Sequence, residues 1–188
     1  ERAEIKDCIA YLRVIYQNKD DLSFERIINT PKRSIGETTV KQLNEYSKQN
    51  GLSLEKSAIS LIQQNKIKPK TKLGLNSLLN LLAKWRNDLL NKKIGHIKLI
   101  QTILDESGYS QMLKDKKDLE NENRLENIKE LINAMKEYDN LESFLEHVAL
   151  ATSLDQDWED KKVNLMTMHA SKGLEFDVVF LPGWEEGL

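Results

Sequence analysis

The sequence predicts a mainly α-helical protein with a short β segment at its C-terminus. Only three prolines and eight glycines interrupt its 188 residues, which favours long helices. Apolar side chains recur at three- and four-residue spacing through most of the chain, as in helices with one buried face. Residues 163–168 and 176–181 differ, because they are short apolar runs rich in β-prone side chains. We therefore expect about seven to nine helices, followed by two strands joined by a polar connector.

Local sequence predicts the helix boundaries in the first part of the chain. Residues 4–16 carry apolar side chains at helical spacing, and Asp21 or Ser23 can cap a second helix. That helix is predicted to stop before Pro31, because the residue before a proline avoids the α region. A third helix is expected to begin at Gly36.

The remaining helices are predicted from caps and apolar spacing. Gly51 is typical of a helix end, and Ser53 is typical of a cap on the next helix. Residues 67–72 are predicted to form a basic loop, and residues 75–90 a strongly apolar helix. Trp85 on that helix is expected in the core rather than on a surface that stacks bases. Further helical patterns cover residues 94–104, 125–135 and 141–148.

Charge is distributed unevenly along the chain, although the formal net charge is only −2. Residues 1–100 contain 19 Lys or Arg against 10 Asp or Glu, whereas residues 101–188 contain 9 against 20. Within residues 26–98 there are 15 basic and 4 acidic side chains. Such a block suits a polyanion, although charge alone leaves open a lysine-rich surface that contacts only water.

A basic pair, Lys32 and Arg33, comes directly before the predicted third helix, which begins at Gly36. The free backbone N–H groups of a helix N-terminus attract anions, and the hydroxyls of Thr38 and Thr39 can add contacts. Such contacts with phosphates fix the position of a nucleic acid without reading its sequence. These residues leave open the alternative of a plain helix cap with no ligand.

The polar connector between the two apolar runs contains His169, Ser171, Lys172, Gly173 and Glu175. Open α/β sheets place their ligand crevices at the ends of strands, where this connector is expected. Gly173 lets the backbone approach a ligand closely, Lys172 offers a charge for phosphate, and Glu175 can accept hydrogen bonds from sugar hydroxyls. The sequence shows no Cys/His cluster and no nucleophile–base arrangement.

Residues 167–181 resemble the T-x-H-x-x-K-G-L-E-F-x-x-V-F-L motif of the UvrD/Rep/PcrA group of superfamily 1 DNA helicases. Residues 184–188 are similar to the M-E-E-G stretch that follows in that family, with Trp at the Met position. The opening residues resemble the start of the family's helical insertion, the 2B subdomain, which interrupts the second RecA-like lobe. Residues 31–39 resemble its P-x-R-G-I-G-x-x-T element, implicated in holding duplex DNA, with Ser34 replacing the first glycine.

The resemblance implies a division of the chain into three parts. Residues 1–152 would be a helical 2B-type insertion domain, residues 153–162 an acidic linker, and residues 163–188 part of the second RecA-like lobe. The C-terminal β segment would then be cut from its α/β sheet. We expect it to be disordered, folded back as a hairpin, or paired with another copy. Because the chain does not begin with Met, we expect it to be a piece of a larger protein.

The resemblance also implies roles for individual residues, none of them catalytic or metal-binding. Contacts with duplex DNA are expected at Lys32, Arg33, Ser34, Ile35, Gly36, Thr38 and Thr39. Contacts with single-stranded DNA are expected at Thr167 and His169, and Lys172 is expected to face DNA or the neighbouring lobe. Contacts with the nucleotide are expected at Gly173, Leu174 and Glu175, the last of these through the ribose.

The parent protein is expected to be an ATP-dependent 3′-to-5′ DNA helicase of repair or replication that uses ATP and Mg²⁺. The chain itself lacks a G-x-x-x-x-G-K-[ST] phosphate loop, a D-E-x-Q-type acidic strand and the family's arginine segments. Because phosphoryl transfer depends on those groups, this chain should not hydrolyse ATP, and no cofactor is expected to stay bound. The expected partners are DNA at a duplex/single-strand junction and the remaining helicase domains.

The composition suits a soluble protein of a reducing compartment, and the resemblance implies the bacterial cytoplasm. The single Cys8 cannot form an internal disulfide, and no apolar run is long enough to span a membrane. A second hypothesis is a non-enzymatic helical module that binds DNA or another protein. Binding to DNA that weakens steeply with salt would favour DNA contact, and salt-insensitive binding to a protein would favour an adaptor.

Overall fold

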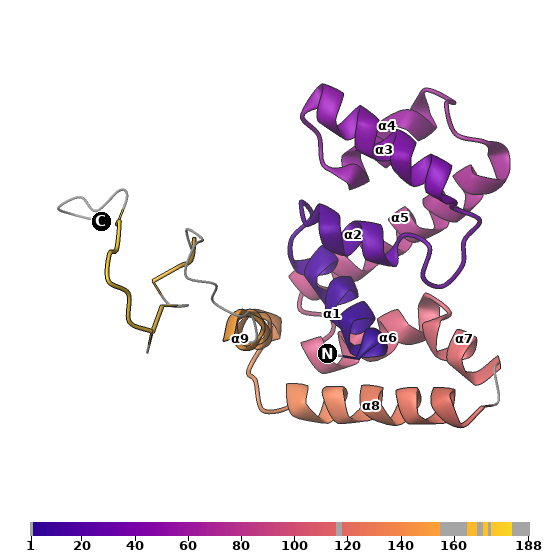
Figure 1. The fold of residues 1–188 in the computed structure, drawn as a ribbon. Coiled ribbons are helices and arrows are strands. Elements are labelled where there is room, and N and C mark those ends of the chain that lie inside the picture. Colours follow the sequence, from indigo (N-terminus) through magenta and orange to yellow (C-terminus); the bar gives the residue numbers. More distant parts are fainter. Residues whose placement is uncertain (1, 116–117, 155–164, 169–170, 173, 182–188) are drawn as a thin grey trace. The chain divides into compact units, whose positions relative to one another are not determined.

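The computed structural model describes residues 2–115, 118–154, 165–168, 171–172 and 174–181. Nine helices form within these residues, so the protein is mainly helical (Figure 1). In chain order they are α1 (Ala3–Tyr16), α2 (Asp21–Ile27), α3 (Glu37–Asn50), α4 (Leu54–Gln63), α5 (Pro69–Leu90), α6 (His96–Glu106), α7 (Tyr109–Asp115), α8 (Leu119–Met135) and α9 (Leu141–Leu154).

The chain divides into two compact units, Glu1–Leu145 and Glu146–Leu188. In the first unit α1 is the central helix, because it packs against α2, α5, α6 and α8. Its Tyr11 and Leu12 are fully buried. Trp85 of α5 is also fully buried and meets the Tyr11 ring edge-on, with ring centroids 6.2 Å apart. The prediction that Trp85 is a core residue is therefore confirmed. The long helix α5 connects the α3–α4 pair to α6 (Figure 1).

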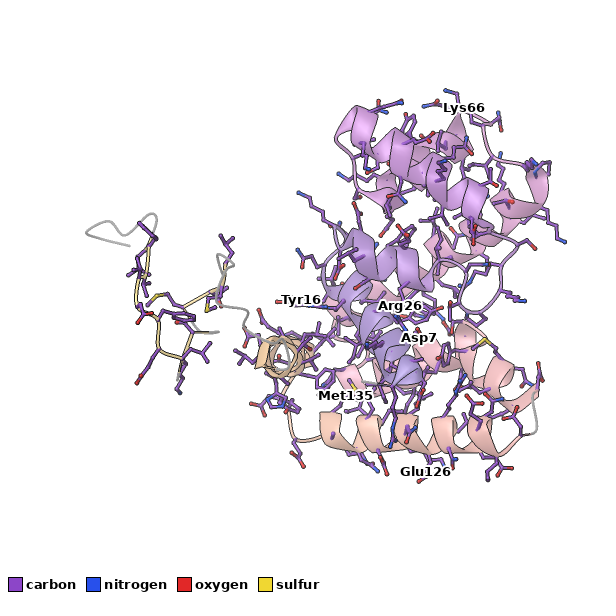
Figure 2. The ribbon with its side chains drawn as sticks, viewed as in Figure 1. Asp7, Tyr16, Arg26, Lys66, Glu126 and Met135 are labelled. Atoms are coloured by element: carbon purple, nitrogen blue, oxygen red, sulfur yellow. The ribbon has the colours of Figure 1, made fainter. Side chains whose placement is uncertain are left out.

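Polar side chains join the central helices of this unit. Arg26 of α2 lies beside Asp7 of α1, with 2.7 Å between Nε and Oδ1 (Figure 2). The other Asp7 oxygen accepts a hydrogen bond from the Tyr109 hydroxyl at 2.7 Å. Arg86 of α5 donates both terminal nitrogens to Glu55 of α4 at 2.6 Å, and Nη2 also donates to a carbonyl of α1 at 2.8 Å. These ion pairs tie α1, α2, α4 and α5 together.

The predicted helix caps agree with the structure except at the start of α2, where a different residue is the cap. The side chain of Asp20, rather than that of Asp21 or Ser23, caps α2. Asp21 instead accepts a hydrogen bond from the first backbone amide of α4 at 2.8 Å. Gly51 ends α3 in the left-handed region with φ of 62°, and Ser53 caps α4 as predicted.

The predicted basic loop is only partly a loop, because α5 begins at Pro69. Proline fits the first turn of a helix, where a backbone N–H is not needed and its fixed φ is already helical. The lysines and leucines that follow are good helix formers. Residues 69–72 therefore extend the apolar helix predicted over residues 75–90 toward the N-terminus.

The predicted C-terminal β segment is wrong. Residues 165–168 and 176–181 form no strand, and neither does any other described residue. A strand is stabilised by a neighbouring strand and by packing of one face, and the described part of the chain provides neither. Leu165 is 97% exposed and Phe180 is 88% exposed. The expected strand-connector-strand arrangement is therefore not found there, and residues 163–164 lie outside the described residues.

Candidate nucleic-acid interface

Residues 28–36 connect α2 to α3 and are called here the α2–α3 turn. The Asn29 side chain organises the backbone of this turn. Its Oδ1 accepts hydrogen bonds from the amides of Arg33 at 2.7 Å and Ile35 at 3.3 Å. Ile35 is only 1% exposed and anchors the turn in the core. These contacts fix the backbone that carries most of the residues predicted to contact duplex DNA.

Arg33 directs its guanidinium against the protein's own main chain. Nη1 donates to the carbonyl oxygens of Ile27 at 2.8 Å and Pro31 at 3.1 Å. Nη2 donates to the hydroxyl of Tyr11 at 2.6 Å, and that hydroxyl donates to the carbonyl of Thr30 at 2.6 Å. Burial raises the pKa of Tyr11, and the nearby Arg33 guanidinium opposes this rise. The Tyr11 hydroxyl is therefore protonated at neutral pH and can donate this hydrogen bond.

Helix α5 closes the turn from another side. The Thr71 hydroxyl donates to the carbonyl of Ser34 at 3.0 Å. Gly74 lies so close to the turn that a Cβ atom on it would be 2.1 Å from the carbonyl oxygen of Arg33. No side chain fits at this position unless the backbone moves. The α2–α3 turn is thus held by contacts with α1, α2 and α5.

The outer surface of the turn carries the groups that remain available to a ligand. Lys32, Ser34, Gly36 and Thr38 are exposed, and Thr39 is half-buried. Ser34 adopts a positive φ of 59°, a conformation that suits the glycine expected there. Gly36 is the N-cap of α3, and no described side chain caps this helix end. The Thr39 amide donates to the Gly36 carbonyl at 3.0 Å, which leaves the amides of Glu37 and Thr38 available to an anion.

Exposed lysines lie close to this surface at the junction of α4 and α5. The Gln42 side chain of α3 donates to the carbonyl of Lys66, which Figure 2 labels, at 3.2 Å. Lys66, Lys68 and Lys70 are all exposed, and Thr71 beside them contacts the turn. None of these lysines, nor Lys32, forms an ion pair with a carboxylate in the described part of the chain. Their positive charge is therefore not neutralised locally.

The other predicted site residues lie in the unit Glu146–Leu188 and are described separately. Their described hydrogen bonds are local: the Ser171 amide donates to the Thr167 carbonyl at 3.1 Å, and the Leu174 amide to the Ser171 carbonyl at 3.0 Å. Thr167, Lys172 and Glu175 are exposed, Leu174 is half-buried, and His169 and Gly173 lie outside the described residues.

Asn29, Thr71 and Gly74 hold the turn but were not predicted as part of the site. A glycine inside an apolar helical pattern often marks a close backbone approach, so Gly74 could have been found. Asn29 is of a residue type whose side chain bonds to nearby backbone amides, which is a weaker signal. No local pattern marks Thr71, because its partner lies on a distant segment of the sequence.

The described residues offer groups that can bind a ligand. No set of three or more His, Cys, Asp and Glu side chains among them could hold a metal ion. Burial, with Asp7 and Glu4 nearby, raises the pKa of Cys8 to about 12, so this thiol is neutral at pH 7. Of the helices that the structure describes, none combines the length and apolar character needed to cross a membrane.

Known proteins resemble this chain over its whole length. Residues 1–188 match the UvrD-like helicase C-terminal domain. DNA helicase II of Rickettsia typhi is 38% identical over 191 residues, which cover 100% of this chain and 29% of that protein. ATP-dependent DNA helicase PcrA of Bacillus subtilis is 37% identical over 201 residues, covering 100% of this chain and 27% of that protein. PcrA of Staphylococcus aureus (strain Mu50) is 36% identical over 198 residues, which cover 100% of this chain and 26% of that protein.

This chain spans less than a third of the length of these relatives. The family match nevertheless covers every residue of the chain, and it agrees with the motif in residues 167–181. The chain belongs to the UvrD-like helicase C-terminal domain family.

Proposed function

We propose that this chain is a part of an ATP-dependent DNA helicase of bacterial cytoplasm and that it contributes contact with duplex DNA. The observation that carries the proposal is the family match over residues 1–188. Relatives covering the whole chain are named DNA helicase II and ATP-dependent DNA helicase PcrA. The complete protein would use ATP and Mg²⁺ and unwind DNA with 3′-to-5′ polarity in repair or replication.

In this proposal residues 1–152 are the 2B-type insertion, and the α2–α3 turn contacts the DNA backbone. The exposed Lys32 and the uncapped N-terminus of α3 at Gly36 supply a cation and backbone donors on one surface. The hydroxyl of Thr38 adds an exposed donor beside them. Contacts of this type bind phosphates of any sequence, as a helicase that moves along DNA requires.

The C-terminal residues have a different proposed role. Residues 153–162 would link the insertion to residues 163–188, which return to the second RecA-like lobe of the complete protein. Thr167, His169 and Lys172 would then face single-stranded DNA, and Gly173, Leu174 and Glu175 would border the nucleotide. The exposure of Lys172 and Glu175 supports this, since exposed side chains can meet another domain or a ligand.

The isolated chain should bind DNA without hydrolysing ATP. It has no phosphate loop and no acidic strand for Mg²⁺, the groups that position and neutralise the transferring phosphate. The test is fluorescence anisotropy of a labelled duplex with a 3′ single-stranded tail, titrated with the 188-residue chain at several salt concentrations. The logarithm of the binding constant should fall linearly with the logarithm of the salt concentration. The slope should be about −0.9 for each phosphate contacted.

Two results would contradict the proposal. One is the absence of DNA binding at low salt, and the other is binding whose strength does not depend on salt. A protein-interaction module would give the first result. In the complete protein, Glu175→Ala should raise the KM for ATP more than it lowers kcat, and an unchanged KM would contradict the proposed contact with the ribose.

A further inference from the structure

We propose that Arg33 is a positioning residue that holds the α2–α3 turn from inside, while Lys32 is the cation of this pair that meets the DNA backbone. This inference rests on the proposed contact between the turn and duplex DNA. The two residues are adjacent in sequence and equal in charge, so sequence alone assigns them the same role. The structure separates them, because Lys32 is exposed and the Arg33 guanidinium contacts the protein.

The hydrogen bonds of Arg33 occupy both terminal nitrogens. Nη1 lies within hydrogen-bonding distance of three carbonyl oxygens, those of Ile27 at 2.8 Å, Pro31 at 3.1 Å and Ile28 at 3.4 Å. Nη2 donates to the Tyr11 hydroxyl at 2.6 Å. The planar fork that binds a phosphate with two parallel hydrogen bonds is therefore already used.

The acceptors around Arg33 belong to three segments of the chain. Ile27 and Ile28 lie at the C-terminal end of α2, where the carbonyl oxygens carry partial negative charge. The Ile27 carbonyl also accepts a hydrogen bond from the Thr30 amide at 3.1 Å. Pro31 belongs to the turn itself, and Tyr11 belongs to α1. No carboxylate in the described part of the chain forms an ion pair with Arg33. The guanidinium thus interacts with main-chain dipoles and joins α1, α2 and the turn.

Loss of this guanidinium would release the turn on the side of α1 and α2. The contacts from Thr71 and Gly74 of α5 would remain on the other side. Lys32 and the first amides of α3 would then lose their fixed positions relative to each other. A lysine at position 33 would keep the charge but could not reproduce the fork, because an ammonium is a point charge without planar geometry.

The experiment compares the 188-residue chain with Lys32→Gln, Arg33→Lys, Arg33→Gln and Tyr11→Phe, using the same salt-dependent DNA titration. The salt slope is the slope of the logarithm of the binding constant against the logarithm of the salt concentration. Lys32→Gln should make this slope shallower by about 0.9 and leave the melting temperature unchanged. Arg33→Lys should weaken binding by about tenfold and lower the melting temperature, with the salt slope unchanged. Tyr11→Phe should resemble Arg33→Lys, although Tyr11 is fully buried and cannot touch DNA.

The opposite pattern would overturn the inference. If Arg33→Lys keeps wild-type affinity and Arg33→Gln loses as much salt slope as Lys32→Gln, then Arg33 is a phosphate ligand. The proposed DNA contact would survive that result, whereas a wild-type chain that fails to bind duplex overturns both proposals. If circular dichroism shows that the Arg33 variants do not fold, Tyr11→Phe decides the question: unchanged DNA affinity in that variant rejects the inference.

Discussion

The α2–α3 turn and the segment 165–181 both carry residues predicted to bind ligands, but their surroundings differ. The turn is held by the side chains of Asn29 and Arg33 and by close contact with Gly74 of α5. In the C-terminal segment, the Ser171 amide donates to the Thr167 carbonyl and the Ser171 hydroxyl to the Met168 carbonyl, contacts between residues close in sequence. Most of its described apolar side chains are exposed, with Phe180 at 88%.

This difference teaches that a strong sequence motif and a finished site are separate properties. The C-terminal motif is the clearer of the two in sequence, yet most of its described residues are exposed. The turn has a weaker motif, with Ser34 in place of a glycine, yet its backbone is fixed by several contacts. Binding by the turn should therefore be a property of this chain, while binding by the motif should require the rest of the protein.

The largest expected effect compares one phenylalanine from each unit. Phe24 of α2 is 2% exposed, so Phe24→Ala should reduce the free energy of unfolding by about 3–5 kcal/mol through lost burial and a cavity. Phe180→Ala should change it by less than about 0.5 kcal/mol. Urea unfolding followed by circular dichroism measures both. A substantial cost at Phe180 would show that the C-terminal segment packs against something in solution.

Gly74→Ala should destabilise the protein by about 1–3 kcal/mol, because its Cβ would overlap the Arg33 carbonyl oxygen. The direction of this change in stability is informative, because alanine in a helix interior is normally more stable than glycine by about 0.5–1 kcal/mol. Ser77→Ala, at an exposed position of the same helix, is the matched control and should be close to neutral. Thermal unfolding of both variants provides the measurement, and a stabilised Gly74→Ala would mean that the turn and α5 are not in close contact.

Cys8 should make stability depend on pH in the alkaline range. Burial raises the pKa of this thiol from its ordinary value to about 12, so the unfolded chain releases the proton first as pH rises. The contribution of the protonated thiol to the free energy of unfolding is therefore complete below about pH 9. It is lost as pH rises toward about 12. Between pH 8 and 10 the wild type should lose about 1 kcal/mol more stability than Cys8→Ala. Equal losses in the two proteins would indicate an accessible thiol.

The smallest expected effect is a gain in stability at the turn. Ser34 has a φ of 59°, which costs a non-glycine residue about 1–2 kcal/mol. Glycine removes that cost but loses more conformational freedom on folding, so Ser34→Gly should stabilise by about 0.5 kcal/mol. Ser34→Ala keeps the unfavourable conformation and should not stabilise. Melting temperatures of the two variants test this, and a gain in both would reject the conformational explanation.

The predictions from sequence succeeded where the cause is local. Gly51 and Ser53 end and begin helices through contacts within a few residues, so their roles could be identified directly. The prediction of a C-terminal β segment failed for the opposite reason, because a strand depends on a partner strand and the described residues of this part include none. The basic stretch before residue 75 was partly misassigned, since Pro69 can start a helix as well as interrupt one.

In the candidate site too, sequence predicts local features but not contacts between distant segments. The helix start at Gly36 was predicted from adjacent residues. The inward orientation of Arg33 depends on Tyr11, which belongs to another helix, and Gly74 meets the turn only through the packing of α5. Helical periodicity assigns Gly74 to a face of α5 but does not identify the segment that face will contact.

The close approach of Gly74 to Arg33 also constrains how this sequence can vary. Any residue larger than glycine at position 74 requires the carbonyl of residue 33 to move, and the hydrogen bond from Thr71 to the next carbonyl would move with it. Substitutions at positions 33, 34, 71 and 74 should therefore be tolerated only in compatible combinations. A natural variant with a larger residue at position 74 would identify a protein whose connection between these helices follows a different path.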